Sequence, residues 1–284
     1  MVITLSAVVV RSADYLRRAG IDRARLEAEL VIAHGLGLSR LDLYLQFDRP
    51  LDSPELSRLR PLVRLRASGC PLGYVLGTQE FCGRDFEVRV GVLIPRPESE
   101  LLVEIGLDRL GDRAKLCADL GCGSGCLGVS LAAGDSEVEV DAVDISSVAR
   151  DLTAANAEHH HVRDRLRTFE GEWSAPLWDR GPYQLIVTNP PYVTTAEWGE
   201  LPTSVRDFEP RGALDGGSDG LASYRQLLPS LGRVTQPGST VLIEGDPRRL
   251  PMLRALAIGT WPAAKTTIHR DLFGRERVLE VEVK

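Results

Sequence analysis

Two patterns of apolar positions divide the chain. Through residues 1–75, the apolar side chains recur at helical spacing. From residue 115 onward, short apolar runs of strand type alternate with helical stretches, which is typical of a sheet with helices on both faces. The intervening stretch is rich in turn residues and holds two short alternating runs. We therefore predict a helical domain over residues 1–75, a β-hairpin connector over 76–97 and an α/β domain over 98–284.

The helical domain is predicted to contain four helices. Asp22 is placed to cap the second, and Ser53 begins the fourth, which Pro61 should kink or split because proline has no N–H to donate. The apolar start of the chain has no basic region before it, so we assign it to the first helix and not to a signal peptide. The predicted helices cover residues 6–18, 23–34, 39–45 and a segment that begins at residue 53.

The remainder of the chain is predicted to begin with a hairpin, followed by a helix from Pro97 to Leu110. Pro95-Arg96-Pro97 is either a stiff linker or a loop folded over the mouth of a cofactor site. The hairpin is expected at residues 79–82 and 86–90, and the strands of the sheet at 116–120, 138–143, 167–169 and 183–187, with an antiparallel end at 263–269 and 278–283.

A glycine-rich turn follows the first strand of the α/β domain. It reads Asp119-Leu120-Gly121-Cys122-Gly123-Ser124-Gly125 and runs directly into a helix. Glycines allow tight turning and close approach of a ligand to the backbone, and nucleotide-like cofactors bind at such strand–turn–helix junctions. This turn alone also suits dinucleotide dehydrogenases, or a strand–helix connection without any ligand.

The next two strands end in residues that suit a nucleoside. Asp144 lies about twenty residues past the glycine turn, where a carboxylate can bind two ribose hydroxyls. Its alternative role is to help cap the helix that begins at Ser146. Glu172 and Trp173 follow the third strand and suit an adenine, although Trp173 also suits a core position.

The fourth strand stops abruptly at Asn189-Pro190-Pro191-Tyr192. The two prolines fix two φ angles and remove two backbone donors, which leaves a stiff corner that presents the Asn189 side-chain oxygen and nearby carbonyls as acceptors. Tyr192 adds a flat aromatic wall, so the corner suits a planar NH2 group; the alternative is a rigid turn. All of these features fall at the carboxyl ends of parallel strands, where open α/β sheets bind ligands.

Composition narrows the possible functions. The net charge of −6 argues against a protein that binds long stretches of nucleic-acid backbone. Residues 1–75 nevertheless carry a net charge of +3, and Arg58, Arg60, Arg64 and Arg66 form either a solvated helix face or a docking patch. The five cysteines lack paired metal spacing, and the run at residues 159–161 has no ligand cluster near it, so we expect no metal site and a reducing cytoplasm. No apolar run is long enough to span a membrane.

The order and spacing of the glycine turn, Asp144 and the Asn-Pro-Pro-Tyr corner resemble the class I S-adenosylmethionine-dependent methyltransferases. The corner is similar to that of the branch that methylates planar nitrogens. Further matches narrow the resemblance to the HemK/PrmC family, over nearly the whole chain. They lie at residues 25–30, 71–77, 80–81, 93–98, 208–225 and 270–278.

The resemblance implies a Rossmann-like seven-stranded mixed sheet, a small all-α N-terminal domain that docks the substrate, and S-adenosylmethionine as the cofactor. It also implies methylation of the N5 amide of the glutamine in the Gly-Gly-Gln motif of class 1 peptide chain release factors. The cofactor-binding residues implied are Gly121, Cys122, Gly123, Ser124, Gly125, Asp144, Glu172, Trp173 and Asn189. The substrate-binding residues implied are Asn189, Pro190, Pro191 and Tyr192. Of these, Asn189, Pro190 and Tyr192 are expected to be catalytic.

The chain departs from the family pattern in two places. Glu172 stands where many members have aspartate, and the stretch Glu244-Gly245-Asp246-Pro247-Arg248 differs after the fifth strand. We expect neither to touch the glutamine pocket directly, so both should affect affinity more than activity.

Three other functions stay open. They are methylation of a glutamine in a ribosomal protein, adenine-N6 methylation of nucleic acid, and cofactor binding without turnover. The acidic α/β domain and the lack of a separate basic domain disfavour the nucleic-acid substrate. We expect a monomer that binds a release factor and has no direct contact with nucleic acid or membrane.

Overall fold

The structure is a computed structural model that describes residues 3–111 and 115–284. The first residue of the predicted apolar start, Val2, lies outside the described residues. The chain forms two compact units. Unit 1 comprises Met1–Thr78 and Pro202–Phe208, and unit 2 comprises Gln79–Leu201 and Glu209–Lys284. Among the described helices, none combines the length and apolar character needed to cross a membrane.

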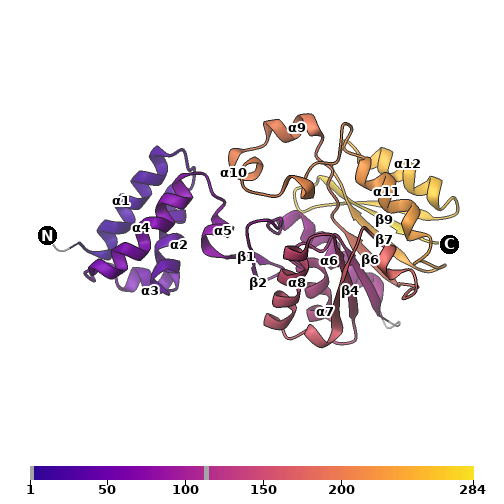
Figure 1. Ribbon diagram of the computed structural model, residues 1–284, viewed down its shortest axis with the longest axis horizontal. Helices are drawn as coiled ribbons and strands as arrows, with labels where there is room; N and C mark the ends of the chain where they lie inside the picture. The colour runs from indigo at the N-terminus through magenta and orange to yellow at the C-terminus, as the bar shows by residue number, and fades with distance from the viewer. Residues whose placement is uncertain (1–2, 112–114) are drawn as a thin grey trace. The chain divides into compact units, whose positions relative to one another are not determined.

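Unit 1 is a helical bundle (Figure 1). The first helix is capped by Thr4, whose hydroxyl accepts a hydrogen bond from the Ala7 N–H. Side chains at helical spacing, such as Leu5, Leu16 and Ile32, are fully buried and form its core. Its helices are α1 (Leu5–Arg18), α2 (Ala24–Leu36), α3 (Arg40–Leu45), α4 (Ser53–Ala67), α5 (Leu72–Leu76) and α10 (Thr203–Arg206).

Two predicted details of this bundle are wrong. Asp22 does not cap α2, because the first backbone hydrogen bond of that helix runs from the Glu27 N–H to the Arg23 carbonyl, which makes Arg23 the N-cap. Pro61 does not split α4, which continues as one helix through it. Buried Leu59 and Val63 hold the helix against the bundle on both sides of the proline, so tertiary packing outweighs the missing donor.

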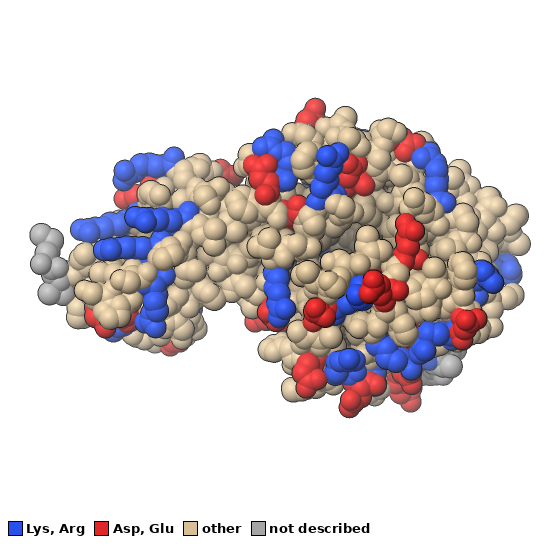
Figure 2. Space-filling view, viewed as in Figure 1, with Lys and Arg blue, Asp and Glu red and all other residues tan. Residues whose placement is uncertain are grey.

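The predicted arginine patch loses one member. Arg66 is buried, where it forms an ion pair with Glu27 and donates from Nη1 to the Cys70 carbonyl at 3.1 Å. Arg58, Arg60 and Arg64 remain exposed on α4. Lys and Arg side chains predominate on the face of unit 1 shown in Figure 2, whereas both signs are mixed over unit 2.

A short segment from the second half of the chain completes unit 1. Pro202–Phe208 belongs to this unit, and Phe208 packs against its apolar core. The ring of Phe208 lies 3.6 Å from the position that a Cβ on Gly69 would take, which shows how closely the segment is seated. Sequence periodicity could not find this association because the segment is far from the bundle along the chain.

Unit 2 is built on the predicted seven-stranded mixed sheet, with the strand order β5-β4-β3-β6-β7-β9-β8 (Figure 1). The first five of these strands are parallel, and β9 pairs antiparallel with both β7 and β8. The strands are β3 (Leu116–Leu120), β4 (Glu139–Asp144), β5 (Leu166–Glu170), β6 (Leu185–Thr188), β7 (Thr240–Glu244), β8 (Lys265–Arg270) and β9 (Glu276–Glu282).

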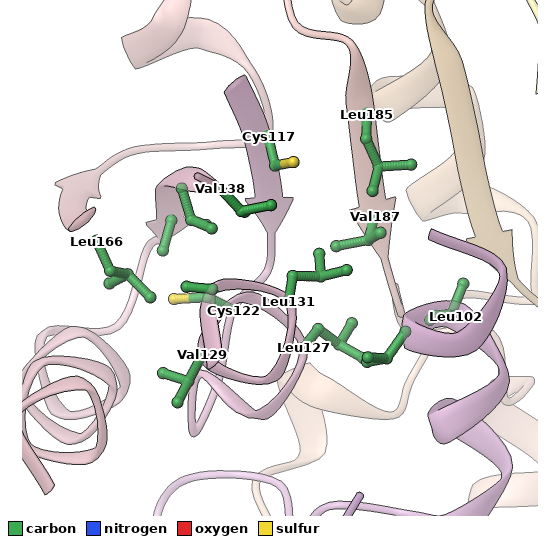
Figure 3. Packing of buried hydrophobic residues seen from close by; sticks show 14 of the residues in the cluster. Leu102, Cys117, Cys122, Leu127, Val129, Leu131, Val138, Leu166, Leu185 and Val187 are labelled. Atoms are coloured by element: carbon green, nitrogen blue, oxygen red, sulfur yellow. The ribbon is translucent and has the colours of Figure 1, made fainter. Parts of the chain in front are cut away.

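Helices cover both faces of the sheet. Figure 3 shows Cys117, Leu185 and Val187 of the central strands facing Leu131 of α7 and Leu102 of α6. The alternate strand residues, such as Ile186, pack on the other face against α11 and α12. The helices of the unit are η1 (Pro97–Ser99), α6 (Glu100–Leu110), α7 (Cys126–Gly134), α8 (Ser147–His159), η2 (Arg163–Arg165), η3 (Ala175–Leu177), α9 (Thr195–Glu200), η4 (Arg211–Ala213), α11 (Ala222–Leu231) and α12 (Leu250–Thr260).

The predicted hairpin is present, with β1 (Thr78–Phe81) paired to β2 (Arg84–Glu87). Its second strand begins two residues earlier than predicted, because Cys82 and Gly83 alone form the turn. Both have positive φ, 50° and 69°, as a two-residue type I′ turn requires. Phe81 and Phe86 are fully buried and meet edge to face, which anchors the hairpin on unit 2.

Candidate active site

A cavity of about 420 Å³ lies at the carboxyl ends of the parallel strands. Its walls come from the turn after β3, the ends of β4 and β6, the segment after β5 and the loop that precedes η1. The stretch from Pro210 to Asp215 and helix α11 also contribute. The predicted residues that line it are Gly121, Cys122, Gly123, Ser124, Asp144, Glu172, Trp173, Asn189, Pro190 and Pro191. Gly125 and Tyr192 are not among the lining residues.

The glycine turn is held tightly against β4. The N–H groups of Gly121 and Cys122 both donate to the Val143 carbonyl, at 2.8 and 3.0 Å. Gly121, Gly123 and Gly125 have φ of 74°, 56° and 79°, the left-handed region in which a side chain is strained. A Cβ on Gly125 would also lie 2.8 Å from Thr153 Cγ2, so Gly125 is needed for packing although it does not face the cavity.

Asp144 connects β4 to the glycine turn. Its Oδ2 accepts from the Gly123 N–H at 3.0 Å, and its Oδ1 accepts from the Ser146 N–H at 2.8 Å. The helix cap itself comes from Ser146, whose hydroxyl accepts from the Ala149 N–H. Each carboxylate oxygen keeps acceptor capacity beyond these bonds, so Asp144 can also receive hydroxyl donors from within the cavity.

Trp173 has an unusual backbone and an unsatisfied donor. Its φ of 51° is rare for a residue with a side chain. The indole packs against the apolar cluster beneath the cavity, and no described residue accepts a hydrogen bond from its buried Nε1. Glu172 beside it is exposed. A flat apolar wall next to an exposed carboxylate suits a base that carries an amino group.

The loop before η1 forms part of the cavity wall, as the second interpretation of Pro95-Arg96-Pro97 proposed. Leu93 to Arg96 line the cavity. Buried Glu209 holds this loop, because its carboxylate accepts from the Ile94 N–H at 3.2 Å and from the Arg96 guanidinium at 2.5 Å. Two of the stretches that resemble the family, residues 93–98 and 208–225, are therefore held together by hydrogen bonds in the fold.

The corner after β6 is fixed from two sides. Thr188, the last residue of the strand, donates from its hydroxyl to the Leu120 carbonyl at 2.7 Å. Asn189 donates from Nδ2 to Ser99 Oγ at 3.0 Å. Tyr192 packs into the cluster below the cavity and donates from its hydroxyl to Glu244 Oε1 at 3.1 Å. Its expected role as a wall against the substrate stays a prediction.

Sequence reasoning missed Ser99 and Glu244. Ser99 was assigned only to a helix start, and the stretch from Glu244 was expected to stay away from the glutamine pocket. Glu244 does not line the cavity, but it accepts a hydrogen bond from Tyr192 and is connected to Asn189 through Ser99. Whether it affects affinity more than activity stays a prediction. Burial raises the pKa of Glu244, and the donors Ser99 and Tyr192 oppose that rise. Its place at the carboxyl end of β7 is the sequence feature that pointed to it.

The histidine run lies apart from this cavity. His160 Nε2 is 3.1 Å from the Asp85 carbonyl, and its ring packs on Phe86 at 4.7 Å. Within the described residues, no group of three or more His, Cys, Asp or Glu side chains is placed to hold a metal ion.

The cavity fits S-adenosylmethionine on several observations. The turn from Gly121 to Ser124 lines the cavity, and Asp144 offers a carboxylate there. Trp173 offers an aromatic surface, and its own Nε1–H has no hydrogen-bond partner among the described residues. These features follow one another along the edge of the sheet in the order β3, β4, β5, which matches an amino-acid part, a ribose and a base. Asn189 and Pro190 close the end of the cavity at β6.

Comparisons with known proteins identify the family. Residues 8–77 match the PrmC N-terminal domain, and residues 97–201 match the methyltransferase small domain. The chain is 45% identical over 241 residues to the release factor glutamine methyltransferase of Geobacter sulfurreducens, with 85% of this chain and 84% of that protein covered. It is 38% identical over 277 residues to the release factor glutamine methyltransferase of Nitratidesulfovibrio vulgaris, with 97% and 94% covered.

Solved structures support the fold. The catalytic domain of hMettl16, in complex with MAT2A 3′UTR hairpin 6, has a TM-score of 0.56 at 16% identity, with 84% of this chain and 85% of that chain covered. The ribosomal protein L11 methylase from Lactobacillus delbrueckii subsp. bulgaricus has a TM-score of 0.50 at 18% identity, with 69% and 85% covered. Unit 2 thus has the class I methyltransferase fold, and the predicted family is confirmed: this chain belongs to the release factor glutamine methyltransferases.

Proposed function

We propose that this protein transfers a methyl group from S-adenosylmethionine to the side-chain amide N5 of the glutamine in the Gly-Gly-Gln motif of class 1 peptide chain release factors. The observation that carries the proposal is the cavity that ends at Asn189 and Pro190, in a chain whose relatives are named release factor glutamine methyltransferases. Relatives at up to 45% identity over most of their length support the same substrate.

The residues that would hold the cofactor are spread along the cavity. The turn from Gly121 to Ser124 would bind its methionine part, Asp144 its ribose, and Glu172 with Trp173 its adenine. When bound, the cofactor supplies a methyl group on a positively charged sulfur, which leaves without help from an acid. Among the residues described in the cavity wall, none needs to act as a general base for this step.

Asn189 and Pro190 would position the substrate. An amide nitrogen is a poor nucleophile because its lone pair is delocalised into the carbonyl. If Asn189 Oδ1 and the Pro190 carbonyl accept the two N–H groups, the NH2 is held in one orientation and its lone pair faces the cavity. Acceptors that are fixed in advance also stabilise the positive charge that develops on the nitrogen. Such positioning can supply several kcal/mol, about 7–11 in favourable intramolecular cases.

We assign the docking of the release factor to unit 1 and the chemistry to unit 2. Unit 1 carries the matched PrmC N-terminal domain and the exposed arginines Arg58, Arg60 and Arg64. We expect a monomer with a protein substrate, no direct binding to nucleic acid, and a place in the cytoplasm, where release factors act in translation.

The test is methyl transfer from labelled S-adenosylmethionine to a purified, unmodified class 1 release factor. A parallel reaction uses the same factor with its Gly-Gly-Gln glutamine changed to alanine. Label on the intact factor alone is expected. Label on both factors, or only on a ribosomal protein or nucleic acid offered separately, would overturn the substrate.

A further inference from the structure

A continuous line of hydrogen bonds runs behind the corner, from Asn189 to a buried carboxylate. Asn189 Nδ2 lies 3.0 Å from Ser99 Oγ, and Ser99 Oγ lies 2.5 Å from Glu244 Oε2. The other carboxylate oxygen, Oε1, receives the Tyr192 hydroxyl at 3.1 Å. These residues come from η1, β7 and the segment after β6, so only the folded unit brings them together.

Glu244 receives a donor at each carboxylate oxygen, and in its ionised form the line of hydrogen bonds has only one direction. An ionised carboxylate accepts hydrogen bonds and donates none, so Ser99 must give its single hydroxyl proton to Glu244. The Ser99 oxygen can then only accept from Asn189, and of the two ends of that amide only Nδ2 carries hydrogen. Asn189 Oδ1 is therefore turned away from Ser99, and no described residue donates to it. The two ends of an asparagine amide have nearly the same shape, so the hydrogen bonds that anchor it decide which end faces the cavity.

The anchor is rigid. Glu244 and Ser99 are 1% and 3% exposed, so water does not compete for their hydrogen bonds. The main chain at Glu244 is also held, because the buried Tyr224 hydroxyl donates to its carbonyl at 2.9 Å. Glu244 is thus fixed at its backbone and at both carboxylate oxygens.

We propose that Glu244 and Ser99 are positioning residues that fix Asn189 as an acceptor towards the substrate, and so select an NH2 group. This inference rests on the proposed function, since it concerns the same corner. A glutamine amide can donate to Asn189 Oδ1. A glutamate carboxylate in its place has no hydrogen to donate and would meet an acceptor, which is repulsive. The line of hydrogen bonds from Asn189 through Ser99 to Glu244, which we call the relay, therefore explains discrimination between glutamine and glutamate, whose side chains have nearly equal shape.

The test measures kcat and KM separately for methyl transfer to an unmodified release factor. Ser99→Ala removes the acceptor for Asn189 Nδ2, and kcat should fall about ten- to a hundredfold while KM changes less than threefold. Ser99→Thr keeps the hydroxyl and should recover most of kcat. Glu244→Gln can donate as well as accept, so the direction is lost and kcat should fall about tenfold. The double variant should be no slower than Ser99→Ala, because both changes act through Asn189.

A matched control separates this relay from the loss of any buried hydroxyl. Ser239 is 1% exposed and donates to the Tyr183 carbonyl at 2.6 Å, before the amino end of β7 and so at the opposite edge of the sheet. Ser239→Ala should leave kcat unchanged. The relay is overturned if Ser99→Thr is as slow as Ser99→Ala, or if the effects of Ser99→Ala and Glu244→Gln multiply.

A second measurement does not depend on the substrate. In urea unfolding, the midpoint shifts of Ser99→Ala and Glu244→Gln should not add in the double variant, because the two residues share one hydrogen bond. Additive shifts would overturn the relay whatever the substrate is. If the wild-type protein labels a ribosomal protein or RNA and no release factor, the proposed function fails. The same kcat ratios are then required on that acceptor, and their absence would overturn the relay too.

Discussion

Asp119 shows how one buried side chain can set a dependence on pH. It is fully buried beneath the glycine turn, where Oδ2 accepts from the Gly128 N–H at 2.9 Å and no described residue donates to Oδ1. Burial raises its pKa to about 7, against an ordinary value of 3.8. The folded protein therefore holds a proton at a pH where the unfolded chain has released it.

We expect the free energy of unfolding to fall as the pH rises from 5 to 8, by about 2–3 kcal/mol from this group alone. The sign follows because a raised pKa favours the folded state below the unfolded pKa, and that advantage is lost as the pH rises through about 7. Asp119→Asn removes the titration and should flatten this part of the profile in urea unfolding. The exposed Asp179→Asn is the control. Equal pH profiles for wild type and Asp119→Asn would contradict the raised pKa.

Residue types at strand ends made much of the site predictable, and its supporting residues were harder to find. The glycine turn, Asp144, Trp173 and Asn189 each follow a predicted strand, so they could be expected at one edge of the sheet. Ser99 lies before a helix, and Glu244 lies at the end of a strand, in a stretch taken as a departure from the family pattern. Their importance depends on hydrogen bonds across 145 positions of the chain, which no local pattern records.

At the scale of elements, α4 illustrates packing that overrides a local preference. Pro61 lies inside the helix and is exposed, so its ring does not contribute to the core. The helix still begins with a capping box between Asp52 and Glu55, and its buried side chains hold it on the bundle. Proline inside a helix costs about 3 kcal/mol relative to alanine.

Pro61→Ala should therefore raise the free energy of unfolding by about 1–3 kcal/mol, measured by urea unfolding with the helical signal of circular dichroism. The gain is below the full cost because proline also restricts the unfolded chain. Pro54→Ala provides the comparison, since Pro54 lies in the first turn, where a proline is well tolerated. It should give no gain. A loss of stability in Pro61→Ala would show that the proline fits α4 without cost.

At the scale of the whole molecule, the two units divide the tasks that we propose. All residues that line the cavity belong to unit 2. The exposed arginines of α4 belong to unit 1, which has its own apolar core. A ligand that binds only the folded state raises the free energy of unfolding of the unit that it contacts, by RT ln(1 + [L]/Kd).

S-adenosylmethionine at about 100 times its Kd should stabilise unit 2 by about 2.7 kcal/mol. In hydrogen–deuterium exchange we expect stronger protection of the glycine turn, of residues 143–146 and of 171–173, because these stretches line the cavity. Residues 5–67 should exchange at an unchanged rate. Asp144→Ala is the control and should reduce the protection. Protection that rises equally in residues 5–67 would contradict the assignment of cofactor binding to unit 2 alone.

The class of fold and the order of the site residues along the sheet follow from local patterns in the sequence. Apolar spacing separated the helical bundle from the α/β sheet, because helices and strands bury side chains with different periods. Gly-rich and Pro-rich stretches marked where strands end, because these residues restrict or free the backbone locally.

Features that depend on distant contacts could be found in the folded chain alone, and the structure supplied them. It assigned Pro202–Phe208 to unit 1, buried Arg66 and kept α4 whole through Pro61. It also joined Asn189 to Glu244 through Ser99. The physical reason is the same in each case: burial and hydrogen bonding are set by neighbours in space, and these neighbours are far apart along the chain.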